Sequence, residues 1–159
     1  MEKSNFERML EIIDAVFETR NDPDQLQVTE EDRAKLESLH PSTLSEYSEG
    51  KGPCVWVLLI PTTNELMEQF VKGEISENAL LRNTPVGINY EAVYLCSATT
   101  LPEYRGKGIT TQLTLDAINT MRTEHPIQNL FVWPFSPEGK KLAQKISDRL
   151  NLPLQVKSH

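Results

Sequence analysis

The sequence predicts a mixed α/β fold (α+β), in which helices flank a mixed central sheet in three layers. Three observations predict it: an apolar, β-branched run at 55–60, a β-rich run at 93–100 that meets a glycine-containing turn, and helical periodicity on both sides of these runs. With 159 residues the chain is long enough to bury its own core, so we expect one domain over 1–159.

Two helices are expected before the first strand. Ser4 opens a capping-box pattern, and the apolar residues that follow share one helical face: Phe6, Met9, Leu10, Ile13, Val16 and Phe17. Thr29 caps a second helix that ends at His40, which precedes a proline. The Ser-rich stretch 41–52 predicts a short helix and a loop.

The middle of the chain predicts a strand and two further helices. The continuous apolar run 55–60 suits a strand that is buried on both faces. The pattern at 62–72 is helical, with Gly73 at its C-terminus, and Ser76 caps a shorter helix. A loop then leads to the central strand at 90–100.

The C-terminal part predicts alternating strands and helices. We expect a helix over 109–122, a strand over 129–133, a helix over 137–150 and a short closing strand at 152–156. The strand–helix–strand order around the first of these helices predicts a right-handed crossover between parallel strands.

Composition limits the functional classes. The chain has 16 Lys and Arg against 23 Asp and Glu, which gives a formal net charge of −7. We therefore expect no nucleic-acid partner, because no basic stripe is available to neutralise phosphates; a cationic amine substrate is compatible with this charge. The N-terminus lacks an apolar signal core and no run approaches the ~18 apolar residues of a membrane span, so we expect a cytoplasmic protein without membrane association.

Neither the cysteines nor the histidines predict a metal site or a disulfide. Cys54 and Cys96 lie in apolar, strand-like runs and are interpreted as buried thiols. His40, His125 and His159 are scattered along the chain without the spacing of metal ligands. The expected metal content is none.

A glycine-containing loop carries most of the functional signal. The central strand meets a Pro-containing turn and then Arg105-Gly106-Lys107-Gly108, and these glycines run directly into a helix. Glycines let the backbone approach an anion closely, and a helix N-terminus offers unpaired N–H groups and the positive end of its dipole. Arg105 and Lys107 add positive charge, so the pattern predicts a phosphate cradle. A plain tight turn is the structural alternative.

Two common phosphate loops are excluded. No string in the chain has the spacing of a Walker A loop. A dinucleotide fingerprint needs a third glycine where Thr111 stands, and the strand that ends at Trp133 brings no acid to hold a ribose.

The string Leu-Pro-Glu-Tyr at 101–104, followed by Arg105-x-x-Gly108-x-Thr110, resembles the acetyl-CoA loop of the GNAT N-acetyltransferase superfamily. That loop usually ends in glycine or alanine, so Thr110 departs from it. The resemblance covers about 90–150 and implies a GNAT-like sheet and an acyltransferase that moves an acetyl group from acetyl-CoA to an amine by direct attack.

The resemblance also implies where acetyl-CoA binds. In that superfamily the two strands beside the crossover helix splay apart, and the pantetheine arm of CoA lies in the gap; Pro134 stands near the point where pairing should stop. The residues implied in CoA contact are Ala98, Thr99, Thr100, Arg105, Gly106, Lys107, Gly108, Ile109, Thr110 and Ser136.

The catalytic groups are less clear from the sequence. The family commonly takes its acid from a tyrosine in the last helix, and Ala143 stands at that position. Glu91 and Tyr90, at the start of the central strand, are candidate catalytic groups, and alternation points them to opposite faces of the sheet. Ser136 is the third candidate, with a helix cap as its structural alternative.

The resemblance stops before residue 90, which implies an atypical, helix-rich N-terminal half. Either an antiparallel pair is hidden in weak segments such as 26–28 and 85–89, or this half is rebuilt. We expect a small or peptide amine as acceptor, entering beside the helices at 62–82, which carry four acids: Glu65, Glu68, Glu74 and Glu77.

Three functional hypotheses remain at this point. The first is an active N-acetyltransferase, and the second is a catalytically degenerate module that binds CoA or an acyl-CoA as a sensor or a partner subunit. The third is a structural protein without a CoA role. A homodimer is left open.

Overall fold

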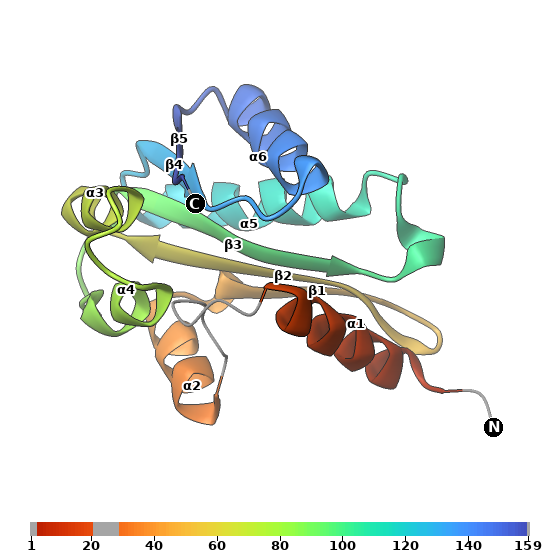
Figure 1. Cartoon of the computed structure of the whole chain (residues 1–159). Coiled ribbons are helices and arrows are strands. Elements are labelled where there is room, and N and C mark those ends of the chain that lie inside the picture. Colours follow the sequence, from red (N-terminus) through yellow and green to blue (C-terminus); the bar gives the residue numbers. More distant parts are fainter. Residues whose placement is uncertain (1–2, 21–28, 159) are drawn as a thin grey trace.

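The computed structural model describes residues 3–20 and 29–158, and the side chains of all of these except 14–20. The described residues form six α-helices, two short 3-10 helices and one five-stranded sheet, so the predicted mixed α/β class is confirmed (Figure 1). None of the helices in these ranges is both long and apolar enough to span a membrane.

The sheet is mixed, with the strands in the order β1-β2-β3-β4-β5. The strands are β1 (Leu44–Glu49), β2 (Gly52–Thr62), β3 (Ala92–Thr100), β4 (Asn129–Val132) and β5 (Leu154–Val156). Strand β2 is antiparallel to both β1 and β3, whereas β4 runs parallel to β3 and β5 runs parallel to β4. The predicted parallel pair and the short closing strand are therefore confirmed.

Helices cover both faces of this sheet (Figure 1). They are α1 (Asn5–Arg20), α2 (Glu30–Leu39), α3 (Asn64–Val71), α4 (Glu77–Asn83), α5 (Ile109–Glu124) and α6 (Pro137–Leu150). Helices α5 and α6 lie above the central strands in Figure 1, and α1, α2 and α4 lie below them. Helix α3 packs on the same face as α4, because Phe70 of α3 and Glu77 of α4 both contact Tyr94 of β3.

One prediction for the N-terminal half is wrong. The stretch 41–52 forms a 3-10 helix (Pro41–Thr43) and then β1, rather than a helix and a loop. Strand β1 has only two apolar residues, Leu44 and Tyr47, because it pairs on one side only and lies at the edge of the sheet. The hidden antiparallel pair is therefore β1–β2; of the two segments suggested for it, 26–28 lies outside the described residues and 85–89 forms a loop.

Helix α1 begins where the sequence predicts, yet three of the four described side chains on its apolar face are exposed. Met9 is fully buried, whereas Phe6, Leu10 and Ile13 are 52%, 42% and 38% exposed. The side of α1 that faces the sheet runs through Met9 and Asn5, whose Nδ2 lies 3.8 Å from Cys54 Sγ of β2. The residues of α1 that contact the sheet therefore lie one position away, around the helix, from the apolar residues that the sequence predicts to be buried.

The buried core joins β2, β3 and β4 to the helices on either side. Four aromatic rings form its centre on the α3 face: Phe70, Tyr94, Phe131 and Trp133. Tyr94 and Phe131 are stacked with their ring centroids 5.0 Å apart. Because β3 and β4 hold these two rings in register, the core fixes how the parallel strands meet.

Candidate functional site

The glycine loop joins the end of β3 to the first turn of α5. Gly106 and Gly108 both have left-handed backbone conformations, with φ of 74° and 77°, and Gly108 is the N-cap of α5. A Cβ atom built at either glycine meets no other atom within 4 Å, so the backbone here faces open space. Glycine is required for the conformation rather than for packing, and the free N–H groups of the first turn of α5 border that space.

Polar contacts hold the two sides of the loop together. The hydroxyl oxygens of Thr100 and Thr110 lie 2.7 Å apart, and Arg105 Nε donates to the Thr100 carbonyl at 3.2 Å. Thr110, the residue that departs from the family pattern, therefore bonds the helix to the end of the strand. A pocket of about 200 Å³ lies against the loop and is lined by Tyr104, Gly106, Gly108, Ile109, Thr110, Thr111 and Lys145.

The two parallel strands separate before they reach this loop. Pairing between β3 and β4 covers Ala92 to Tyr94 and stops at the pair Tyr94–Phe131. Strand β3 continues to Thr100 and pairs with β2 over this further length. The ladder with β4 does not extend along 95–100, and the β4-side edge of this stretch (the open edge) leads straight to the glycine loop. Pairing stops earlier than at Pro134, the point that the sequence suggests.

A bulge in β3 lies where the strands separate. Leu58 of β2 is opposite Ser97, but its neighbour Leu59 is opposite Leu95, so the register shifts by one residue at Cys96. Such a bulge turns the strand locally and re-aims its backbone groups.

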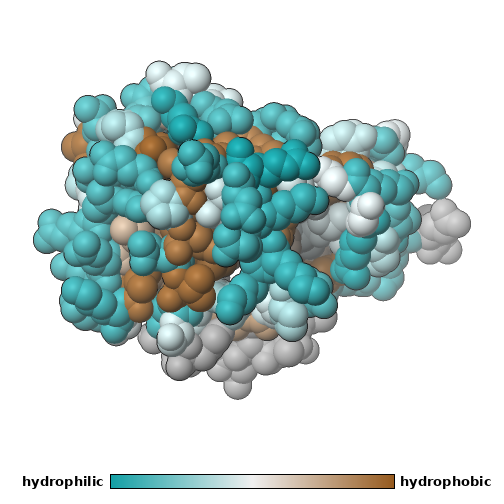
Figure 2. All heavy atoms as spheres, turned by 90° about the horizontal axis from the view of Figure 1, so that it is seen from above, coloured by the Kyte–Doolittle hydropathy of each residue, from teal (hydrophilic) through white to brown (hydrophobic). Residues whose placement is uncertain are grey.

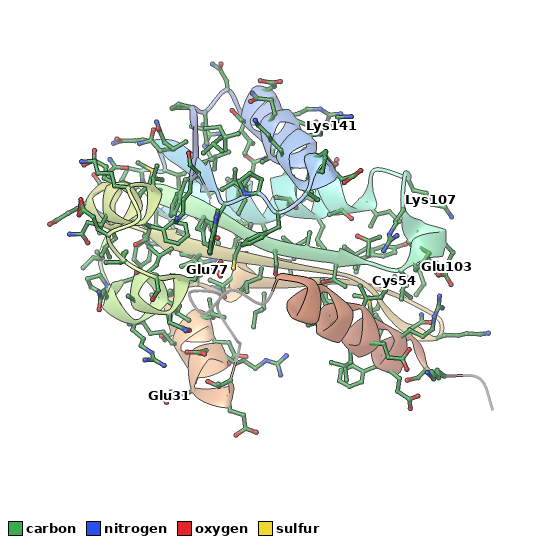
Figure 3. All side chains as sticks on the ribbon, viewed as in Figure 1. Glu31, Cys54, Glu77, Glu103, Lys107 and Lys141 are labelled. Carbon is green, nitrogen blue, oxygen red and sulfur yellow. The ribbon has the colours of Figure 1, made fainter. Side chains whose placement is uncertain are left out.

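A buried carboxylate stands beside this bulge. Glu77, the first residue of α4, is only 2% exposed, and its Oε2 accepts a 2.6 Å hydrogen bond from the Tyr94 hydroxyl. The same oxygen lies 3.7 Å from Cys96 Sγ. Figure 3 shows Glu77 below the middle of the sheet and Lys107 at the end of the sheet where the loop lies. The interpretation of Glu77 as one of four surface acids is wrong, although Glu65, Glu68 and Glu74 are exposed as expected.

The predicted catalytic groups Tyr90 and Glu91 lie at the end of β3 that is opposite the glycine loop. Both precede the strand, and the five residue-to-residue steps from Glu91 to Cys96 span about 16 Å of extended chain. The Tyr90 hydroxyl donates to the Pro85 carbonyl at 2.7 Å, and Glu91 Oε1 accepts from the Asn64 N–H at 3.3 Å. The structure does not bring either residue to the glycine loop or to the bulge.

Ser136 and Ala143 lie on α6, and neither offers a clear catalytic group. The Ser136 hydroxyl accepts a 3.0 Å hydrogen bond from the Gly139 N–H, as the N-cap of α6. Ala143 is 2% exposed and faces the core. The helix-cap alternative therefore accounts for Ser136.

An ion pair from α1 and hydrogen bonds from the β1–β2 hairpin hold the turn before the glycines. Arg8 donates two hydrogen bonds of 2.7 Å to the Glu103 carboxylate, and this lowers the pKa of Glu103 to about 2. Nearby, hydrogen bonds with the Cys54 thiol and the Glu49 carboxylate raise the pKa of the Tyr104 hydroxyl. The turn before the glycines is thus anchored from α1 and from the β1–β2 hairpin.

Two histidines that the sequence separates lie together in the fold. His40, Glu124 and His125 each offer a ligand atom within 4.8 Å of the others. His40 Nδ1 accepts from the Ser42 N–H at 3.0 Å, and His125 Nδ1 accepts from the Tyr90 N–H at 3.4 Å. A neutral histidine that binds a metal through Nε2 carries its own proton on Nδ1. In both rings, however, Nδ1 accepts a hydrogen bond from a backbone N–H group, so the ring proton belongs on Nε2. The cluster therefore fits a hydrogen-bonded pair, His40 Nε2 to Glu124 at 2.9 Å, better than a cation. His159 lies outside the described residues.

The sequence contains signals for the residues that were missed. Glu77 stands three and four positions before Leu80 and Leu81, so helical periodicity puts it on their buried face. Lys145 of α6 lines the loop pocket, and its sequence signal is the row Lys141, Lys145 and Arg149 at intervals of four.

Comparisons with models of protein families, with curated proteins and with solved structures found no match for this chain.

Proposed function

We propose that this protein is an acyl-CoA-dependent N-acyltransferase that moves an acetyl group from acetyl-CoA to an amine. One observation carries the proposal: β3 parts from β4 after Tyr94, and its open edge runs into a loop with two left-handed glycines at the start of α5. An open strand edge suits a thin, amide-containing arm, and the loop suits phosphates. The two features are continuous, as one phosphopantetheine thioester requires.

The chain's own groups account for binding. The first-turn N–H groups of α5 and the cations Arg105 and Lys107 would hold the pyrophosphate. The open edge of 95–100 would hydrogen-bond the pantetheine amides, and this includes the predicted residues Ala98, Thr99 and Thr100. An arm that runs along this edge would bring the thioester to the bulge at Cys96.

Glu77 is the proton acceptor that this geometry favours. The amine nitrogen attacks the thioester carbonyl carbon, a C–N bond forms, and the C–S bond breaks with the electron pair on sulfur. Glu77 takes the proton that the amine loses, directly or through water, and this proton returns to the thiolate. A backbone N–H group at the bulge would stabilise the oxyanion. Because Glu77 belongs to α4, the amine would enter from the face that α1, α3 and α4 cover.

Calorimetry of acetyl-CoA binding tests the first part. Gly108→Glu fills the cradle with a side chain and a negative charge, and we expect binding to be lost. Gly87→Glu is the matched control, since Gly87 also has a left-handed φ of 83° and a Cβ there meets nothing within 4 Å. Gly87 lies in the loop before β3, at the end of that strand opposite the glycine loop. Unchanged acetyl-CoA affinity in folded Gly108→Glu protein would contradict the assignment.

Thiol release with a panel of polyamines, amino acids and Lys-containing peptides tests the second part. Glu77→Gln should lower kcat about 100-fold or more, with acetyl-CoA affinity retained. Glu65→Gln, an exposed acid on neighbouring α3, is the control and should leave kcat unchanged.

A module that binds acyl-CoA without turnover is the second candidate. The burial of Ala143 favours it, because no proton donor stands at the position of the family's usual acid. Acetyl-CoA binding without thiol release for any amine in the panel would establish this candidate and reject the enzyme.

A further inference from the structure

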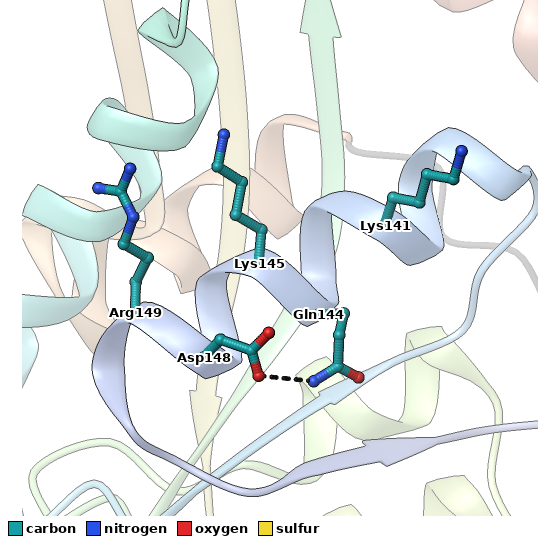
Figure 4. Close-up of a pocket in the computed structure, with 5 residues that line it drawn as sticks. All are labelled: Lys141, Gln144, Lys145, Asp148 and Arg149. Atoms are coloured by element: carbon teal, nitrogen blue, oxygen red, sulfur yellow. Dashed lines mark hydrogen bonds between the residues drawn. The ribbon is translucent and has the colours of Figure 1, made fainter.

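Helix α6 carries a row of cations beside the glycine loop. Lys141, Lys145 and Arg149 repeat at intervals of four, about 6 Å apart along the axis, so they share one side of the helix. Figure 4 shows the three side chains extending to the same side of α6. They border a surface pocket of about 460 Å³, together with Gln144 and Asp148.

This α6 pocket adjoins the loop pocket. Lys145 lines both of them, so one side chain of the α6 row also borders the pocket at the first turn of α5. Figure 2 views the molecule from above, on the side of α5 and α6, and most of the residues on that face are hydrophilic. A ligand that binds at the glycine loop therefore lies next to the α6 row at Lys145.

The row has no protein counter-charge in the part of the chain that the structure describes. No carboxylate there forms an ion pair with Lys141, Lys145 or Arg149. Asp148, the acid within the row, accepts a 2.9 Å hydrogen bond from Gln144 on the other side of the helix (Figure 4). Like charges four residues apart destabilise a helix slightly, so an anion bound here would relieve this repulsion. In a chain with a net charge of −7, three cations line the two pockets, namely Lys141, Lys145 and Arg149, and two more, Arg105 and Lys107, belong to the glycine loop itself.

We infer that the α6 row binds a phosphate monoester, namely the 3′-phosphate on the ribose of CoA. This inference rests on the proposed function. The ribose carries the pyrophosphate on its 5′ oxygen, so a pyrophosphate at the glycine loop leaves the 3′-phosphate one sugar away, next to Lys145. A phosphate monoester carries a charge of about −1.5 to −2 at pH 7 and three acceptor oxygens, which suit ammonium and guanidinium donors. The row thus selects CoA over thioesters that lack this phosphate.

Calorimetry with CoA and 3′-dephospho-CoA tests this selection. The unaltered protein should bind CoA about tenfold or more tightly than 3′-dephospho-CoA. The double variant Lys141→Gln, Arg149→Gln should reduce this preference without weakening the binding of 3′-dephospho-CoA, because neither residue lines the loop pocket. Adding Lys145→Gln, which gives the triple variant, should abolish the preference. Lys140→Gln is the matched control, because Lys140 lies on the same helix and lines neither pocket.

The possible failures are distinguishable. Equal affinities of the unaltered protein for the two ligands would overturn the inference and leave the proposed function intact. An equal loss of both ligands in the triple variant would also overturn it, since the row would then act on the shared part of the ligand. The absence of binding for both ligands in the unaltered protein would overturn the proposed function and this inference together.

Discussion

The hydroxyl oxygens of Thr100 and Thr110 lie 2.7 Å apart and join the last residue of β3 to the first turn of α5. The contact closes the glycine loop at its base, so the loop has little freedom to open. It also explains a residue that sequence comparison with the GNAT pattern leaves unexplained. A threonine in place of glycine or alanine supplies the hydroxyl group that fixes the helix to the strand.

Replacing Thr110 with valine tests this bond. The shape of the side chain is retained and the hydroxyl is lost, so the free energy of unfolding should fall by about 0.5–1.5 kcal/mol. Thr110→Ser, which keeps the hydroxyl, is the control. Urea denaturation measures both variants, and equal stability of the valine and serine variants would contradict a role for this hydrogen bond.

The left-handed conformation of Gly108 predicts a cost for alanine. Gly108→Ala meets no atom within 4 Å, so only backbone strain should destabilise the fold, by about 1–2 kcal/mol. Gly50→Ala has the same free space without a positive φ and should change stability little. If both alanine variants unfold at the same urea concentration, the left-handed conformation at Gly108 is not required.

The buried pair of Glu77 and Tyr94 predicts coupled stability. Tyr94→Phe removes the donor of a 2.6 Å hydrogen bond to a buried carboxylate and should cost about 1–3 kcal/mol. With Glu77→Gln already in place, the same change should cost less, with a coupling energy of about 0.5–3 kcal/mol. A double-mutant cycle by denaturation measures this coupling, and strict additivity would indicate that the two groups do not interact.

The Arg8–Glu103 pair predicts a dependence on pH. The pKa of Glu103 is lowered to about 2 from 4.5, first by its hydrogen bonds from Arg8. The pair therefore stabilises the folded chain above pH 4.5, and this contribution is lost as the pH falls toward 2. We expect an NMR titration of the Glu103 side chain to have its midpoint well below 4.5, and to rise toward 4.5 in Arg8→Gln. A midpoint near 4.5 in the unaltered protein would exclude the pair in solution.

The two histidines predict a particular tautomer. Because both Nδ1 atoms accept backbone N–H groups, the neutral rings of His40 and His125 should carry their proton on Nε2. A long-range ¹H–¹⁵N correlation spectrum at pH 8 distinguishes the two tautomers. One equivalent of Zn²⁺ should leave the Tm unchanged, and a rise in Tm that is lost in Glu124→Gln would contradict the hydrogen-bonded interpretation.

Much of the fold was predictable because its strong elements have local signals. The run 55–60 is apolar throughout, and Thr29, Ser76 and Ser136 each accept a hydrogen bond from the first turn of the helix that they cap. Strand β1 was missed because an edge strand owes its structure to its neighbour rather than to its own apolar pattern. The prediction of which α1 side chains are buried was wrong for Phe6, Leu10 and Ile13, because hydrophobic periodicity does not specify which side of a helix contacts the sheet.

The candidate site was predictable only where it is local. The loop glycines and the cations Arg105 and Lys107 are adjacent in the chain, so a short segment of sequence is enough to predict an anion-binding loop. The meeting of Glu77 with Cys96, or of Lys145 with Gly108, depends on how four separate elements pack, and no local pattern encodes it. The end of the β3–β4 pairing likewise depends on the packing of Tyr94 on Phe131.

The separation of β3 from β4 has a consequence for solubility. Unpaired strand edges usually recruit strands from other molecules, and proteins protect them because such pairing leads to aggregation. Here the length of β3 beyond its ladder with β4 belongs to an internal strand rather than to the rim of the sheet, and β2 pairs with its other edge. A β-strand from a neighbouring molecule would need to enter between strands of the same sheet to pair with it. This position limits the aggregation that an edge of the same length would favour at the rim.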